Sequence, residues 1–200
     1  NLKIPVGWVD YEDGLLIRNR EITINVSAKV SINSTIESGL HYNVVGKLLG
    51  YANPDKFVII SSHYDTVMTT GFVDNGAGTA GVLELARILA EATKEGGYNS
   101  QYTILFIAFA SEELGLVGST NYVMQHKAEM KDIIAVVNLD CIGSDNLNVA
   151  RTDSSESFDL DELILKAAKD LNINTTLTEP GGSDQEVFRN PSWANVGYSQ

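Results

Sequence analysis

Apolar and polar positions along the chain follow two different periods. Residues 22–30 alternate between apolar and polar, which predicts a strand with one wet face, and residues 43–49 form a second candidate strand. Three later runs are continuously apolar, as expected of parallel strands that are covered on both faces: residues 57–60, 102–110 and 133–137. Residues 1–20 carry two glycines and a proline, so this stretch is predicted to be a loop.

Helical patterns separate and follow these runs. Val82, Leu85, Ala86 and Leu89 recur with helical spacing, and residues 160–171 repeat the pattern. A short strand is expected at 173–177, followed by a short helix around residues 187–188 that Asp184 could cap. Strands that alternate with helices predict an α/β fold with a largely parallel sheet.

Composition narrows the class of protein. The 200 residues fit one domain, and 14 basic against 26 acidic residues give a net charge of −12. This balance argues against nucleic acid and anionic membrane surfaces as partners. Cys141 is the one cysteine, which excludes an intrachain disulfide and is expected to be a small buried hydrophobe.

Targeting segments are not visible in the sequence. No apolar run approaches the roughly 18 residues that a membrane span needs. The first residues show neither a basic region followed by an apolar one nor an initiator methionine, so we expect a trimmed chain without a visible signal peptide.

Polar side chains that can bind metal follow each continuously apolar run. Parallel strands present their carboxyl ends at one edge of the sheet, where ligands bind. The candidates at that edge are one histidine and five carboxylates: His63, Asp65, Asp74, Glu112, Glu113 and Asp140. Their mutual repulsion is relieved by a bound cation, and nitrogen and oxygen ligands suit Zn²⁺, Mn²⁺ or Co²⁺. Glu112 and Glu113 are neighbours and should point apart from an extended segment, so that one can bind metal while the other acts as general base.

Four motifs in this order resemble a known family. They are His-x-Asp at 63–65, Asp-Asn-Gly-Ala-Gly at 74–78, Ser-Glu-Glu-Leu-Gly-Leu-x-Gly-Ser at 111–119 and Asn-Leu-Asp at 138–140. Over roughly residues 43–188 the chain resembles the zinc aminopeptidases of metallopeptidase family twenty-eight. Those proteins are di-zinc exopeptidases, and their relatives include glutamate carboxypeptidases. The resemblance implies a three-layer α/β/α fold with a mostly parallel, mixed central sheet.

The same resemblance implies roles for the candidate residues. His63 and Asp140 are expected to bind a first zinc ion, Asp74 to bridge two ions, and Glu113 to bind the second ion. Glu112 is expected to be the general base that deprotonates the attacking water.

Two further expectations come from the family. Asp65 should orient the His63 imidazole, as partners of metal-bound histidines usually do. The peptide bond between Asp74 and Asn75 should be cis.

The chain departs from the family pattern near its C-terminus. The family has a final histidine ligand there, and His41 and His126 do not match its position. Residues 183–188 resemble the segment that precedes that histidine. We therefore expect residues 25–200 to be a catalytic domain that is incomplete at its C-terminus, with a second metal position short of ligands. Residues 1–24 resemble the end of a protease-associated domain or a linker.

The reading that follows is a metal-dependent exopeptidase, foremost an aminopeptidase that acts on peptides with a free N-terminus. By family resemblance it would be secreted or extracytoplasmic. The alternatives are a non-catalytic receptor or interaction module on the same fold, and a carboxypeptidase or glutaminyl cyclase. The sequence leaves side-chain preference and oligomeric state open.

Overall fold

The computed structural model describes residues 9–21, 27, 29, 31, 33, 35, 37–67, 70–143, 147–150, 158–178 and 181–189. The chain forms two compact units, Asn1–Gly39 and Leu40–Gln200. The strand expected at 22–30 lies almost entirely outside the described residues. The assignment of residues 1–24 to a protease-associated domain or linker stays a prediction.

The first unit contains one helix, α1 (Tyr11–Glu21), among its described residues. The prediction of a loop over residues 1–20 is therefore wrong from Tyr11 onward. The Asp10 carboxylate accepts a hydrogen bond from the backbone N–H of Asp13 at 2.9 Å, which caps the helix start. Acidic residues in the first turn and basic residues in the last also suit the helix dipole, and together these features outweigh the cost of Gly14.

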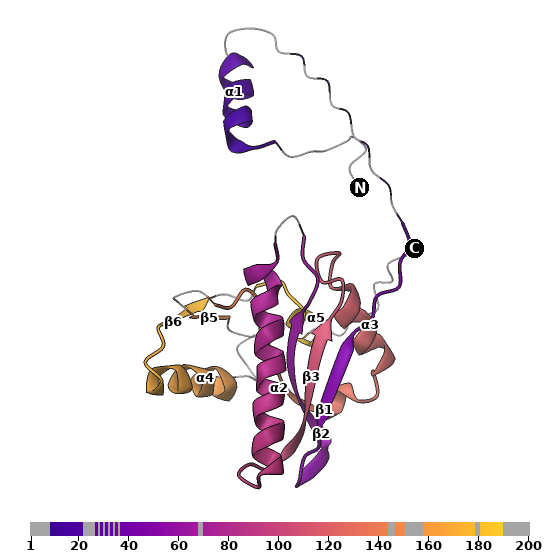
Figure 1. Ribbon diagram of the computed structural model, residues 1–200, viewed down its shortest axis with the longest axis vertical. Coiled ribbons are helices and arrows are strands. Elements are labelled where there is room, and N and C mark those ends of the chain that lie inside the picture. Colours follow the sequence, from indigo (N-terminus) through magenta and orange to yellow (C-terminus); the bar gives the residue numbers. More distant parts are fainter. Residues whose placement is uncertain are drawn as a thin grey trace. The chain divides into compact units, whose positions relative to one another are not determined.

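A four-stranded mixed sheet forms the centre of the second unit. Its strands are β1 (Val44–Leu48), β2 (Asn53–His63), β3 (Tyr102–Phe109) and β4 (Ile133–Asn138), in the order β1-β3-β2-β4. β2 pairs in parallel with both β3 and β4, whereas β1 is antiparallel to β3. The four strands predicted in this part of the sequence are confirmed (Figure 1).

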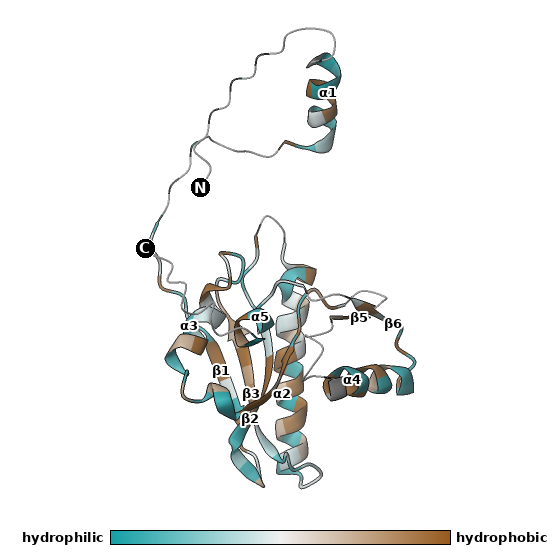
Figure 2. Ribbon diagram, turned by 180° about the vertical axis from the view of Figure 1, so that it is seen from behind, coloured by the Kyte–Doolittle hydropathy of each residue, from teal (hydrophilic) through white to brown (hydrophobic). Residues whose placement is uncertain are grey.

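Helices cover both faces of this sheet, as the α/β/α prediction requires. On one face α2 (Gly78–Lys94) packs Val82 against alternate β3 residues, Ile104 and Phe106. On the other face lie α3 (Val117–Gln125) and α5 (Gln185–Arg189). They cover the β3 side chains that point away from α2. That second core contains Ile59, Leu105, Ile107, Phe109 and Tyr122, with Phe188 against it. Figure 2 shows the apolar strands between the two helical layers.

Shorter elements complete the described structure. Two helical turns, η1 (Phe72–Ala77) and η2 (Met130–Asp132), precede α2 and β4. The predicted later helix is α4 (Phe158–Asp170), and the strand expected at 173–177 is found as β6 (Thr175–Thr178). β6 pairs in parallel with β5 (Leu147–Ala150), a strand that the sequence analysis did not anticipate. No helix in the described part of the chain is both long and apolar enough to cross a bilayer.

Candidate metal centre

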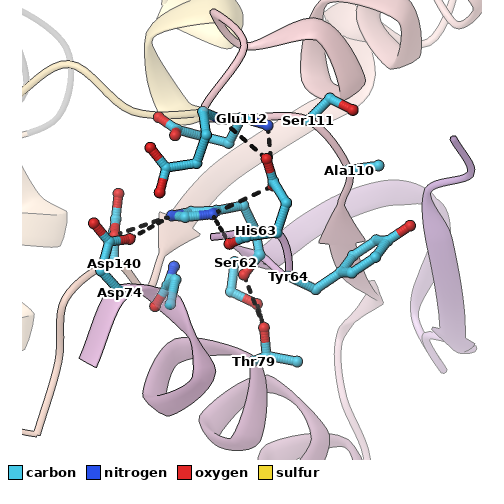
Figure 3. A network of polar contacts seen from close by, with 12 residues as sticks. Ser62, His63, Tyr64, Asp74, Thr79, Ala110, Ser111, Glu112 and Asp140 are labelled. Carbon is cyan, nitrogen blue, oxygen red and sulfur yellow. Dashed lines mark hydrogen bonds and ion pairs between the residues drawn. The ribbon is translucent and has the colours of Figure 1, made fainter. Parts of the chain in front are cut away.

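The carboxyl ends of three parallel strands carry the candidate side chains. β2 ends at His63, Glu112 follows β3, and Asp140 follows β4. Asp74 comes from η1, the turn that leads into α2. The parallel register of the strands brings the first three residues to one edge of the sheet, and the turn adds Asp74; Figure 3 shows Asp74, Glu112 and Asp140 around the His63 ring.

The His63 imidazole is the centre of the cluster and is 1% exposed. Its Nε2 lies 3.1 Å from an oxygen of Asp74 and 3.4 Å from an oxygen of Asp140. Its Nδ1 lies 3.1 Å from the backbone oxygen of Asp65. The Thr79 hydroxyl donates to the His63 carbonyl at 2.8 Å, which ties the end of β2 to α2.

Asp65 connects two of the chain segments that build the centre. Its carboxylate accepts hydrogen bonds from the backbone N–H groups of Glu112 and Glu113, at 3.1 and 3.2 Å. One of its oxygens is 3.5 Å from Nδ1 of His63, farther than the Asp65 backbone oxygen. Asp65 thus faces the imidazole, and it also anchors the Glu112–Glu113 turn, which the sequence analysis missed.

Glu112 and Glu113 lie in a tight turn rather than an extended segment. The Glu112 carbonyl accepts hydrogen bonds from the N–H groups of Gly115 and Leu116, both at 2.8 Å. The expectation that the two glutamates point apart is wrong for this reason. Each offers a carboxylate oxygen that lies within 4.8 Å of the other and of a His63 nitrogen.

The side chains therefore form two overlapping groups of possible metal ligands. One is His63, Asp74 and Asp140, and the other is His63, Glu112 and Glu113, each with its ligand atoms within 4.8 Å of one another. An imidazole with several carboxylates, and no thiolate in either group, is a donor set that fits zinc. The first group matches the ligands expected of the first ion.

The loop that carries Asp74 is fixed by its neighbour Asn75, which is 1% exposed. The Asn75 amide donates to the Leu139 carbonyl at 2.9 Å and accepts from the Gly78 N–H at 3.1 Å. The peptide bond between Asp74 and Asn75 is cis, which confirms the expectation from the family.

The cluster perturbs the pKa values of its own members. Burial alone would lower the pKa of His63, but the hydrogen bond and charge of Asp140, with the charges of Glu112 and Asp184, raise it to about 9. Burial raises the pKa of Glu112 to about 7; the charge of His63 opposes this, and Asp184, Asp140 and Glu113 add to it. Crowded acids around one imidazole therefore hold protons that a bound cation would replace.

Two residues near the centre differ from expectation. Cys141 is exposed, not buried, and it has a left-handed backbone conformation directly after Asp140. Asp184 is fully buried, and its carboxylate accepts no hydrogen bond from the described residues, so it does not cap α5. Neither feature has a signal in the sequence, because both depend on how separate segments pack.

A cavity of about 430 Å³ adjoins the centre. Asp140 and Cys141 lie at it, and its walls include apolar side chains from β4, β5 and α4: Val136, Leu147, Val149, Leu160 and Ile164. It offers room beside the candidate metal ligands for an apolar group.

A three-layer α/β fold with a histidine and carboxylates at the carboxyl edge of its sheet defines a candidate metallohydrolase. A comparison with known families matches residues 43–198 to Peptidase family M28. The chain belongs to this family.

Individual relatives agree with the family assignment. The chain is 33% identical over 195 residues to Aminopeptidase YwaD of Bacillus subtilis, covering 92% of this chain and 40% of the relative. A probable glutamate carboxypeptidase of Arabidopsis thaliana is 34% identical over 155 residues, covering 74% of this chain and 22% of the relative. Among solved structures, the zinc aminopeptidase BSAP from Bacillus subtilis matches with a TM-score of 0.61 at 31% identity, covering 77% of this chain and 38% of that one. The chain thus spans well under half the length of these relatives.

Proposed function

We propose that this protein is a zinc-dependent exopeptidase, foremost an aminopeptidase that removes N-terminal residues from peptides, with two ions in its centre. The observation that carries the proposal is the convergence of His63, Asp74 and Asp140 beside the Glu112–Glu113 turn. The names of relatives, zinc aminopeptidases among them, support the choice of metal and reaction. An extracytoplasmic location remains a prediction from family resemblance.

The chain's own residues divide the chemistry between them. His63, Asp74 and Asp140 would hold one ion, while Asp74 and Glu113 would supply two of the ligands of the other. Zinc supplies Lewis acidity, which polarises the scissile carbonyl and makes water a better nucleophile at neutral pH. Glu112 accepts a proton from the attacking water and passes it to the leaving amine.

The charge of the centre is compatible with aminopeptidase activity. The groups that most perturb the pKa of Glu112 are His63 and three carboxylates, Asp184, Asp140 and Glu113. Carboxylates that a bound cation leaves unneutralised attract the ammonium group of a peptide N-terminus. The adjoining cavity, with its apolar walls, can accept the first side chain of the substrate.

Glu112→Gln tests the division of roles in the full-length protein. It should retain zinc and lose about 10²–10⁴-fold in kcat on aminoacyl anilides, because the general base is removed. Glu113→Gln should instead weaken zinc binding. Glu129→Gln, which changes an exposed glutamate on the connection between α3 and η2, is the matched control and should change neither quantity.

Three results would contradict the proposal. Normal turnover by Glu112→Gln would remove Glu112 from its role. Release of C-terminal rather than N-terminal residues would favour a carboxypeptidase. Absence of both zinc and hydrolysis in the unchanged protein would favour a receptor or interaction module.

A further inference from the structure

Asp184 is a buried carboxylate that the proposed chemistry does not use. It is 0% exposed, and neither of its oxygens accepts a hydrogen bond from the described residues. A hydrogen bond from the nearby Ser119 hydroxyl would lower the pKa of Asp184, but this hydroxyl donates its proton to the Leu116 carbonyl at 3.3 Å instead. Within the described part of the chain, the carboxylate therefore lacks the compensation that buried charges normally receive.

The surroundings of Asp184 belong to the metal centre. Burial raises the pKa of Asp184 to about 6. Ser119 and His63 lower this pKa, whereas the charges of Asp140 and Asp65 raise it further. Asp184 in turn contributes to the raised pKa values of His63 and Glu112. Asp184 is thus within electrostatic reach of the centre, yet it is in neither group of possible ligands.

The segment around Asp184 is held firmly in place. Ser183 and Gln185 both accept hydrogen bonds from the side-chain amide of Asn138, at 2.9 and 3.0 Å, and Asn138 accepts from Ser61 at 2.7 Å. The residues on either side of Asp184 are therefore fixed to β4, which leads to the ligand Asp140. The position of the buried carboxylate is determined by the same framework as the ligands.

We infer that Asp184 is a buried counter-charge that strengthens cation binding at the metal centre without touching the cation. This inference rests on the proposed function. Left uncompensated by hydrogen bonds, the carboxylate destabilises the metal-free fold, and a bound dication compensates it through space. A carboxylate with full hydrogen-bonding partners would exert less of its field on the centre, because those partners would offset it.

Zinc affinity and metal-free stability should change in opposite directions when the charge is removed. At pH 7.5 Asp184→Asn should weaken zinc binding by at least about tenfold, since a unit charge within a protein acts strongly on a dication. The same variant, treated with chelator, should melt at a higher temperature than the unchanged protein. Zinc affinity is measured by competition with a chromophoric chelator, and melting by circular dichroism.

Two variants provide controls. Asp184→Ala removes the charge and the side-chain volume together, so it should lose as much zinc affinity as Asp184→Asn if charge is the cause. Asp132→Asn removes a carboxylate that is paired with Lys56 at the opposite end of β4. It should leave zinc affinity unchanged.

Unchanged zinc affinity in Asp184→Asn would overturn the inference, as would a lower melting temperature or failure of this variant to fold. His63→Ala distinguishes an error in the role of Asp184 from an error in the proposed function. If His63→Ala binds zinc as tightly as the unchanged protein, the metal centre itself is misassigned. If His63→Ala loses zinc and Asp184→Asn does not, only the role of Asp184 is wrong.

Discussion

The side chain of Asn75 joins two segments that each carry a candidate ligand. Asp74 directly precedes it, and its amide donates to the carbonyl of Leu139, which directly precedes Asp140. Its oxygen also accepts from the first residue of α2. The distance between the two carboxylates thus depends on one buried amide.

Asn75→Ala should lower the free energy of unfolding by about 2–3 kcal/mol, because it removes two buried hydrogen bonds and leaves the Leu139 carbonyl without a partner. Zinc affinity should fall with it, since Asp74 and Asp140 are no longer held together. Urea unfolding and zinc titration measure the two effects. Asn121→Ala, at an exposed asparagine that donates to the Val117 carbonyl within α3, should have little effect. Equal stability of the two variants would contradict this account of Asn75.

The candidate metal ligands and the candidate base could be predicted because each lies at or shortly after the end of a strand, or in the turn before a helix. His63, Asp74, Glu112, Glu113 and Asp140 all have such positions, and the structure brings them together. For Asp184 the sequence predicted a helix cap and not a buried carboxylate, because its burial depends on the packing of α3 and α5. The turn at Glu112 was also missed, since the positive φ of Ser111 has no glycine to signal it.

The start of α3 packs against the end of β3 more closely than any side chain would permit. A Cβ on Gly118 would lie 2.2 Å from the Ala110 carbonyl and 2.5 Å from the Asn43 side chain. Asn43 reinforces this contact, because it donates to the Gly118 carbonyl and accepts from the Ala110 N–H. The turn that carries Glu112 lies between these two elements.

Gly118→Ala should therefore force α3 away from β3 and cost about 1–3 kcal/mol or more in the free energy of unfolding. Zinc affinity should weaken too, because the Glu112–Glu113 turn moves with α3. Gly97→Ala is a suitable control, as its Cβ would meet nothing nearer than 3.7 Å. Chemical unfolding of both variants measures the difference, and similar midpoints would show that the contact can relax.

Elements with a long and regular pattern were the ones that sequence could predict. β2 and β3 are apolar because helices cover both faces, and α2 has a clear apolar stripe. β5 has only four residues, and its pairing with β6 is fixed by tertiary contact rather than by its own pattern. The sequence did not predict α1, because the glycines and the proline in residues 1–20 indicate a loop and the cap at Asp10 is apparent only in the structure.

At the scale of the whole molecule, an acidic chain concentrates several of its acids around one imidazole. In the metal-free protein three of these groups have raised pKa values: His63 at about 9, Glu112 at about 7 and Asp184 at about 6. Their ordinary values are 6.5, 4.5 and 3.8. At a pH between the ordinary and the raised pKa of a group, that group holds more protons in the folded protein than in the unfolded chain.

Stability of the metal-free protein should consequently fall as pH rises from about 5 to 9. The contribution of protonated His63 is complete below its unfolded pKa and is lost as pH rises through about 9. Ionisation of Glu112 and Asp184 costs stability at lower pH, between their unfolded and folded pKa values.

Excess zinc should reduce or reverse the fall in stability with pH, since metal binds the deprotonated ligands. Melting temperatures at pH 5, 7 and 9, with chelator and with zinc, measure both trends. In His63→Gln, the part of the fall in melting temperature that lies between pH 6.5 and 9 should mainly disappear. A melting temperature in chelator that rises with pH would mean that the cluster is not proton-rich when metal is absent.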